Sequence, residues 1–136
     1  MARQFDLVVF DWDGTLMDSA GAIVRAIMAA CADLGVAPPP EERARHVIGL
    51  GLHDALRHAV PDLAVEDYPY MADRYRYHYL SSDHELQLFG GAREMMEWLA
   101  AQGVCLGVAT GKSRRGLDRA LGYTGLGARF HATRCA

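Results

Sequence analysis

The sequence predicts an α/β fold, a parallel β-sheet into which an all-helical segment is inserted. Two apolar runs, residues 7–10 and 104–109, have the length and composition of buried strands. Between them, no strand pattern occurs from residue 15 to residue 86. The alternation of strands and helices around this segment implies parallel strands that are joined by right-handed crossovers.

The first strand, residues 7–10, consists of four large apolar residues, which is typical of a strand buried on both faces. Asp11 and Asp13 follow it directly, and Gly14 allows the chain to turn sharply. The carboxyl end of a strand is where open α/β sheets place their ligands. Two carboxylates this close repel each other unless a cation or a proton separates them. The pair therefore predicts a hard metal ion, magnesium in the first place, with one carboxylate left to react.

A calcium-binding loop of the helix–loop–helix kind also begins with the pattern Asp-x-Asp-Gly. That loop requires a Glu at its twelfth position, which counted from Asp11 is Ala22. A strand before the motif does not suit that loop either. A catalytic or metal-binding turn is therefore the better interpretation.

Helical periodicity predicts four helices within the inserted segment. Asp18 or Ser19 can cap the first, which runs to about Leu34 and ends at Gly35. Three prolines, at positions 38 to 40, form a stiff break after it. The further helices are expected over residues 41–46, 52–60 and 66–80.

The chain returns to the sheet after glycines 90 and 91. Residues 92–101 are expected to form a helix that Gly103 terminates. Its inward side chains are predicted to be Met95, Met96 and Leu99. The strand at 104–109 comes next, and a third strand is expected between residues 128 and 133.

A second polar group follows the second strand. Thr110, Gly111 and Lys112 stand immediately before a helix that is predicted from Ser113, as its cap, to Leu121. Backbone N–H groups and the helix dipole favour an anion at such a place, and a hydroxyl adds another donor. Thr-Gly is also ordinary turn chemistry. Together with the acidic motif far upstream, a phosphate-binding role is the favoured interpretation.

The run Asp11-Trp12-Asp13-Gly14-Thr15-Leu16 resembles the first signature of the haloacid dehalogenase superfamily. The rest of the chain resembles the phosphoglycolate phosphatase-like branch of that family. The resemblance implies a Rossmann-like parallel sheet, incomplete here, that is built from residues 1–15 and 88–136. It implies that residues 16–87 form an inserted helical cap.

The resemblance also implies roles for individual residues. Asp11 would be the nucleophile that becomes an aspartyl phosphate, and Asp13 would protonate the leaving oxygen and then activate water. Magnesium (Mg2+) would be the cofactor, with Asp11 and Asp13 at the metal. The phosphate and substrate would be bound by Gly14, Thr110, Gly111 and Lys112.

The family pattern does not finish within these residues. Members continue with a lysine that balances charge and with one or two acids that complete the magnesium site, whereas Lys112 and Asp118 are the only lysine and acid after Thr110. Two hypotheses therefore stay open. The first is a magnesium-dependent phosphatase of small phosphorylated metabolites such as phosphoglycolate, with a sugar-phosphate mutase as a variant. The second is a truncated, catalytically incomplete member that acts as a binding or interaction module or has no activity.

Lys112 is the only lysine in the sequence. Because it stands beside the expected phosphate site, it is a candidate substitute for the missing cation. The alternative is an ordinary solvated side chain near the start of a helix.

Composition limits the partners and the compartment. A net charge of −3 argues against nucleic acid as a partner, and no apolar run approaches the roughly 20 residues of a membrane helix. Cys31, Cys105 and Cys135 are odd in number, far apart and in apolar surroundings. They are expected to be packed thiols of a reducing compartment, the cytoplasm. The six histidines show no metal-type pairing with cysteines and are expected mostly at the surface.

The first strand carries a further expectation. In the family this strand is central, and the strands on its far side have no counterpart in this sequence. Residues 7–10 would then form an exposed apolar edge, which is a template for pairing with another chain. A homo-oligomer through this edge, or poor solubility, is expected.

Overall fold

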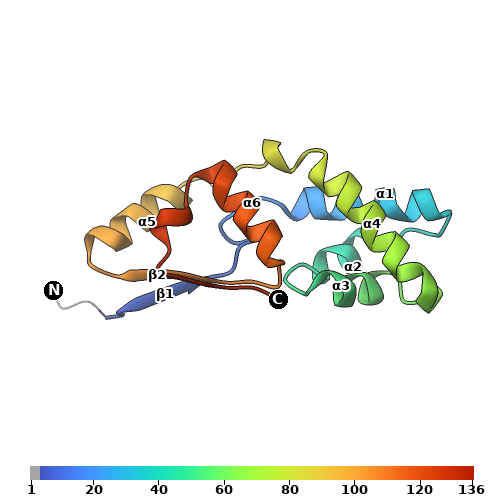
Figure 1. Ribbon diagram of the computed structural model, residues 1–136, viewed down its shortest axis with the longest axis horizontal. Helices are drawn as coiled ribbons and strands as arrows, with labels where there is room; N and C mark the ends of the chain where they lie inside the picture. The colour runs from blue at the N-terminus through green and yellow to red at the C-terminus, as the bar shows by residue number, and fades with distance from the viewer. Residues whose placement is uncertain (1–3) are drawn as a thin grey trace. The chain divides into compact units, whose positions relative to one another are not determined.

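The computed structural model describes residues 4–136 and divides into two compact units. The first unit holds the chain up to Asp18 together with Gln87–Ala136, and the second unit is Ser19–Leu86 (Figure 1). The sequence placed these boundaries at 15/16 and 87/88. The first three residues of the expected 1–15 segment lie outside the described residues.

The first unit is α/β, as predicted. Its sheet has three parallel strands in the order β1 (Leu7–Phe10), β2 (Cys105–Ala109) and β3 (Ala132–Arg134). Helix α5 (Ala92–Ala101) precedes β2, and helix α6 (Arg114–Thr124) connects β2 to β3. Figure 1 shows α5 and α6 on the same side of the sheet.

The two faces of this sheet differ in burial. Leu106 and Val108 are 1% and 2% exposed, whereas Leu7 and Val9 on β1 are 51% and 53% exposed. The prediction that residues 7–10 are buried on both faces is therefore wrong. The physical reason is that Leu7 and Val9 pair with Cys105 and Gly107 and so lie on the opposite face from the buried Leu106 and Val108. Both α5 and α6 lie on one side of the sheet, so they cover only one of its faces.

The helices of the first unit largely follow the sequence. Ser113 caps α6 as predicted, because its Oγ accepts a hydrogen bond from the Gly116 N–H at 3.1 Å. Met96 faces the interior of the unit and is 1% exposed. The expectation that its neighbour Met95 also points inward is wrong, since Met95 is 36% exposed. Adjacent residues on a helix are separated by about 100°, so only one of the two can face the sheet squarely.

Two further expectations fail in this unit. The third strand starts later than predicted, because Gly127–Arg129 forms a 3-10 turn, η3, and the strand occupies Ala132–Arg134. The expectation of packed thiols holds for Cys31, which is buried, but not for Cys105, which is exposed. Cys105 pairs with Leu7 in the sheet and shares its uncovered face.

The second unit is helical throughout, as the sequence predicts. Its four helices are α1 (Ala20–Leu34), α2 (Glu41–His46), α3 (Leu52–Ala59) and α4 (Tyr68–Leu80), with short 3-10 turns η1 (Val65–Asp67) and η2 (Asp83–Glu85). Helix α1 ends at Gly35, whose φ of 67° is the left-handed conformation that glycine adopts without strain.

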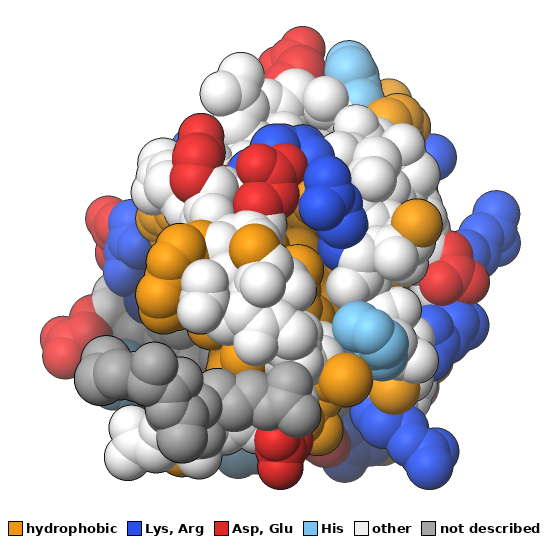
Figure 2. Space-filling model, turned by 90° about the vertical axis from the view of Figure 1, so that its left-hand side faces the viewer, with side chains coloured by type: hydrophobic (Ala, Val, Ile, Leu, Met, Phe, Trp, Pro, Cys, Tyr) orange, Lys and Arg blue, Asp and Glu red, His pale blue; other side chains and the backbone are white. Residues whose placement is uncertain are grey.

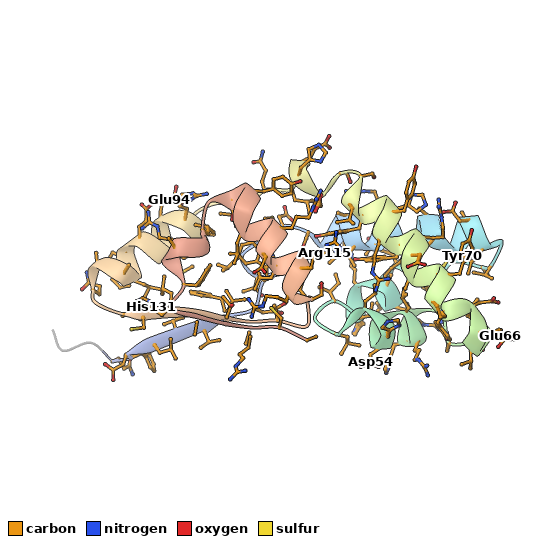
Figure 3. All side chains as sticks on the ribbon, viewed as in Figure 1. Asp54, Glu66, Tyr70, Glu94, Arg115 and His131 are labelled. Carbon is orange, nitrogen blue, oxygen red and sulfur yellow. The ribbon has the colours of Figure 1, made fainter. Side chains whose placement is uncertain are left out.

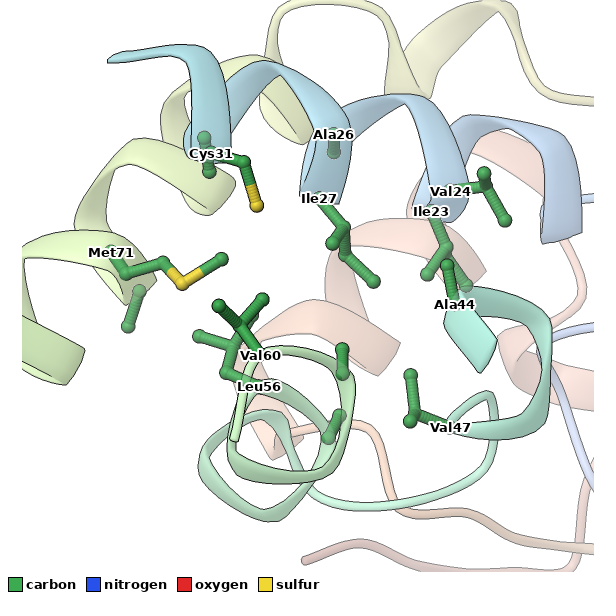
Figure 4. Packing of buried hydrophobic residues seen from close by; sticks show 14 of the residues in the cluster. Ile23, Val24, Ala26, Ile27, Cys31, Ala44, Val47, Leu56, Val60 and Met71 are labelled. Carbon is green, nitrogen blue, oxygen red and sulfur yellow. The ribbon is translucent and has the colours of Figure 1, made fainter. Parts of the chain in front are cut away.

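The core of the second unit lies between α1, α3 and α4. Ile27 and Cys31 of α1, Leu56 of α3 and Met71 of α4 are each at most 1% exposed (Figure 4). Burial raises the pKa of the Cys31 thiol above its ordinary value. This unit therefore has an apolar core of its own.

The surface of the first unit retains some large apolar side chains. Figure 2 views this unit from the end at which α5 lies and shows hydrophobic side chains among charged ones. Phe5 and Trp98 are 61% and 62% exposed. Within residues 4–136, no helix combines the length and the apolar character needed to cross a membrane.

Candidate active site

The acidic turn after β1 is closed by its own backbone. The Trp12 carbonyl accepts hydrogen bonds from the N–H groups of Thr15, Leu16 and Met17, each at 3.1 Å. Gly14 has a φ of 76°, and its N–H donates to the Met17 carbonyl at 2.9 Å. A residue with a Cβ would be strained at this φ, which explains the glycine.

Trp12 anchors this turn in the first unit. Its side chain is fully buried, and its ring meets the Phe130 ring edge-on with centroids 6.4 Å apart. Asp11 and Asp13, on either side of it, are partly buried. One oxygen of Asp11, Oδ1, accepts the Trp12 N–H at 2.7 Å, which orients this carboxylate. This role of Trp12 was not predicted from the sequence, although a large apolar residue between two acids is a visible signal.

The two motifs meet at the carboxyl ends of neighbouring strands. Lys112 follows β2, and its Nζ lies 3.5 Å from Oδ2 of Asp13. The two side chains are only 13% and 12% exposed. A pair so little exposed is screened by solvent much less than a surface ion pair. The ammonium therefore places a strong positive charge at the acidic turn.

The segment between β2 and α6 is held by further hydrogen bonds. Oγ1 of Thr110 accepts the Lys112 N–H at 3.1 Å, and the Thr110 N–H donates to the Arg134 carbonyl at 3.0 Å. A hydroxyl that accepts one hydrogen bond still has a proton to donate. Thr110 can therefore donate to an anion beside the start of α6, with Gly111 next to it in the chain.

The oxygen atoms at this turn that could bind a metal suit a hard cation, but they are few. No group of three or more His, Cys, Asp or Glu side chains within residues 4–136 is arranged to hold a metal ion. Carboxylate and carbonyl oxygens are what magnesium prefers, and this ion keeps several waters when it binds to proteins. Because the Lys112 ammonium lies 3.5 Å from the Asp13 carboxyl and would compete with a cation there, the carboxylate of Asp11 is the better cation ligand. The residues present thus fit magnesium with sparse protein ligation.

His131 is a second supporting residue that was not predicted from the sequence. Nδ1 of His131 accepts a hydrogen bond from the Leu106 N–H at 3.1 Å, and the His131 N–H donates to the Leu106 carbonyl at 2.8 Å. Figure 3 shows the labelled His131 beside the sheet. This side chain extends the pairing between β2 and the start of β3. No periodicity in the sequence distinguishes it from the other histidines.

A hollow in the first unit lies outside the acidic turn. Its volume is about 560 Å³, and residues from Arg114 to Thr133 on α6, η3 and β3 line it. None of Asp11, Asp13 and Lys112 contributes to this lining. The hollow is therefore not the place at which the predicted chemistry would occur.

This chain is similar to known proteins over most of its length. A family model described as "Haloacid dehalogenase-like hydrolase" matches residues 8–136. The chain is 33% identical over 125 residues to the "Tyrosine-protein kinase PtkA" of Mycobacterium tuberculosis, covering 91% of this chain and 42% of the relative. It is 32% identical over 120 residues to the "Phosphoglycolate phosphatase" of Pseudomonas putida, covering 80% of this chain and 42% of the relative.

A solved structure agrees with the fold. The crystal structure of a predicted phosphoglycolate phosphatase from Haemophilus somnus superimposes with a TM-score of 0.85 at 26% identity. The match covers 98% of this chain and 63% of that one. This chain thus spans less than half the length of both curated relatives and less than two thirds of the solved one.

Proposed function

The chain belongs to the haloacid dehalogenase-like hydrolase family, and from this premise we propose that it is a magnesium-dependent phosphatase of small phosphorylated metabolites. The observation that carries the proposal is the acidic turn of Asp11 and Asp13 with the Lys112 ammonium 3.5 Å from Asp13. Both relatives, one named a tyrosine-protein kinase and the other a phosphoglycolate phosphatase, bear the names of proteins that transfer phosphoryl groups. The phosphoglycolate phosphatase relative makes a phosphorylated hydroxy acid the first substrate to test.

The proposed reaction has two steps. In the first, a carboxylate oxygen of Asp11 forms a bond to phosphorus while the phosphorus–oxygen bond of the ester breaks, and Asp13 gives its proton to the leaving oxygen. In the second, Asp13 takes a proton from water, the water oxygen bonds to phosphorus, and the bond to Asp11 breaks. Inorganic phosphate leaves, and both aspartates return to their starting states.

The surrounding groups have separate tasks in this reaction. The Lys112 ammonium, the Thr110 hydroxyl and the Gly111 N–H would bind the non-reacting phosphoryl oxygens. Asp11, with oxygens of Asp13, would hold magnesium. When bound, this ion supplies positive charge that offsets the repulsion between the carboxylate and the phosphate.

Charge and cysteine content support the remaining parts of the proposal. A net charge of −3 disfavours nucleic acid as the substrate. All three cysteines are free thiols, which is compatible with a reducing cytoplasm as the proposed location.

The second candidate is a catalytically incomplete member that binds a phosphorylated ligand or a partner without turning it over. It is favoured by the two-carboxylate turn, since no larger metal-type cluster occurs in the described part of the chain. Such a protein would retain phosphate binding at Thr110 and Lys112.

Hydrolysis of p-nitrophenyl phosphate with and without magnesium tests the proposal. We expect magnesium-dependent turnover by the wild type and a loss of about 10³-fold or more in Asp11→Asn, which removes the nucleophile. Asp118→Asn is the matched control, because Asp118 is an exposed acid on α6 and should leave turnover unchanged. Negligible turnover by all three proteins, with phosphate binding retained, would favour the second candidate.

A further inference from the structure

Gly116 lies in the first turn of α6, directly against the side chain of Lys112. A Cβ at position 116 would lie 3.2 Å from Lys112 Cγ and 3.3 Å from Lys112 Cε. Since both Cγ and Cε of Lys112 are close to this position, the aliphatic part of the Lys112 side chain lies alongside the helix backbone at Gly116. Most real Cβ atoms do not approach other atoms this closely, so a Cβ at this position would require the Lys112 stem to move by a few tenths of an ångström.

The backbone conformation does not require this glycine. Gly116 is absent from the glycines with positive φ in the described chain. Glycine is a poor helix former, because fixing its backbone costs more conformational entropy than fixing that of other residues. A side chain at position 116 would therefore favour the helix itself, which leaves the close neighbours of the Cβ position, Lys112 and Ser113, as the local reasons for the glycine.

Both ends of Lys112 are fixed around this contact. Its N–H donates to Thr110 Oγ1 at 3.1 Å, and its carbonyl accepts the Ala136 N–H at 3.2 Å. Its Nζ lies 3.5 Å from Asp13 Oδ2. A lysine side chain otherwise has four rotatable bonds and points readily into solvent. The contact at Gly116 lies between these two fixed ends.

We propose that Gly116 is a positioning residue for the phosphate site, because the space that it leaves directs the Lys112 ammonium to Asp13 and to the phosphoryl group of the substrate. This inference rests on the proposed function for the identity of the anion. A leaving oxygen that Asp13 protonates must lie within about 3 Å of its carboxylate. The ammonium beside that carboxylate is then within reach of the same phosphoryl group.

One simpler role for Gly116 must be separated from this one. A Cβ at position 116 would also lie 3.2 Å from Ser113 Oγ, the atom that caps α6. In that case the glycine would only leave room for the capping hydroxyl of Ser113 and so stabilise the helix. Ser113→Ala removes the cap and leaves the contact between Gly116 and Lys112, so it distinguishes the two roles.

The single lysine among these 136 residues allows a direct test on the whole of this chain. Protein grown with lysine labelled at Cε with ¹³C gives one lysine signal by NMR. We expect this signal to move in Asp13→Asn, to move in Gly116→Ala and to move further in Gly116→Leu. Gly122→Ala and Gly122→Leu are the matched controls, because Gly122 lies on the same helix with no atom within 4 Å of its Cβ position. The Gly122 variants and Ser113→Ala should leave the signal unchanged.

Titration with inorganic phosphate, followed on the same signal, gives the functional readout. Because a hydrogen bond from a charged group is worth about tenfold or more in affinity, we expect Gly116→Leu to bind phosphate about tenfold more weakly than Gly122→Leu. Equal signals and equal phosphate affinities in the two variants would overturn the inference. A shift in Ser113→Ala as large as that in Gly116→Leu would also overturn it in favour of the cap.

Failure of the proposed function has a different signature. If the wild type does not hydrolyse phosphate esters while Gly116→Leu still shifts the lysine signal and weakens phosphate binding, the phosphatase proposal falls and the positioning role stands. If phosphate leaves the lysine signal of the wild type unmoved, the positioning role toward phosphate falls.

Discussion

At the scale of single residues, the contact between Lys112 and Asp13 joins the two halves of the candidate site. Lys112 Nζ lies 3.5 Å from Asp13 Oδ2, and the two side chains are only 13% and 12% exposed. Removing one partner from such a pair leaves the other charge without compensation in a place that water reaches poorly. The pair should therefore be coupled more strongly than a surface ion pair.

A double-mutant cycle of Lys112→Met and Asp13→Asn measures this coupling. We expect a favourable interaction free energy of about 1–3 kcal/mol. Urea unfolding followed by tryptophan fluorescence reports on the first unit, because Trp12 and Trp98 are the only tryptophans and both belong to it.

The control cycle uses Arg114 and Asp118, whose charged atoms lie 3.6 Å apart on α6 with exposures of 49% and 59%. Exposed helix pairs of this kind are worth about 0.3–0.5 kcal/mol. A Lys112–Asp13 coupling no larger than that of the control would contradict the account of a buried, strongly coupled pair.

The residues at this site were predictable in part. Asp11, Asp13, Thr110 and Lys112 stand out in the sequence because each follows an apolar run that predicts a strand. The structure brings Asp13 and Lys112 together at the ends of β1 and β2. The direct contact was not predictable, because it depends on the side-chain path of Lys112 along α6. The catalytic and binding roles of these residues remain predictions.

At the scale of elements, a polar contact joins α1 to α4 within the second unit. Arg74 Nε and His78 Nε2, both on α4, each lie 2.7 Å from the same oxygen, Oδ2, of Asp33 on α1. The hydrogen bonds from His78 and Arg74 hold the pKa of Asp33 below its ordinary value of 3.8. A carboxyl group with a lowered pKa in the folded state stabilises that state whenever it is ionised in both states.

Asp33→Asn should therefore lower stability in a pH-dependent way. The contribution of Asp33 is fully present above its unfolded pKa and is lost as the pH falls through the lower folded pKa. We expect the wild type to exceed Asp33→Asn in free energy of unfolding at neutral pH, and the difference to shrink below a pH of about 4. Urea unfolding followed by circular dichroism at several pH values measures it.

Asp73→Asn is a control on the same helix. Asp73 is paired with Arg76 at 3.1 Å, but its side chain is 73% exposed. Its substitution should change stability little and without marked pH dependence. A difference between the wild type and Asp33→Asn that persists unchanged into acid would contradict the role of the ionised carboxylate.

Elements with strong local signals were predicted to the residue. The helices α2 (Glu41–His46) and α5 (Ala92–Ala101) begin after a proline and a glycine that fix their starts. Strand β3 was placed too early, because a strand of three residues is defined by its pairing with β2 and not by its own composition. The burial of β1 was also mispredicted, since burial depends on which distant segments cover the sheet.

At the scale of the whole molecule, β1 is an open edge of the described sheet. The Cys105 N–H donates a hydrogen bond to the Asp6 carbonyl. Because main-chain groups alternate in direction along a strand, the N–H and C=O groups of Leu7 and Val9 then point away from β2. We propose that two copies of this chain pair through this edge, because a second copy presents the same strand about a two-fold axis.

A lysine on the edge strand should abolish this pairing. We expect the wild-type chain to sediment as a dimer or larger species at high concentration, and Val9→Lys to shift it toward the monomer. Val9 is 53% exposed, so the charge costs little in the folded chain. Trp98→Lys, at a side chain on α5 that is 62% exposed, is the control and should leave the association unchanged. A monomeric wild type at all concentrations would refute the proposal.

The phosphatase account as a whole requires a phosphoryl group to reside for a time on the carboxylate of Asp11. An acyl phosphate is reduced by borohydride to an alcohol, so quenching the turning-over protein with this reagent should convert residue 11 to homoserine. Peptide mass spectrometry should then find homoserine at position 11 when substrate is present and aspartate there when substrate is omitted. Reduction at another residue, or turnover with no reduction at position 11, would contradict the account.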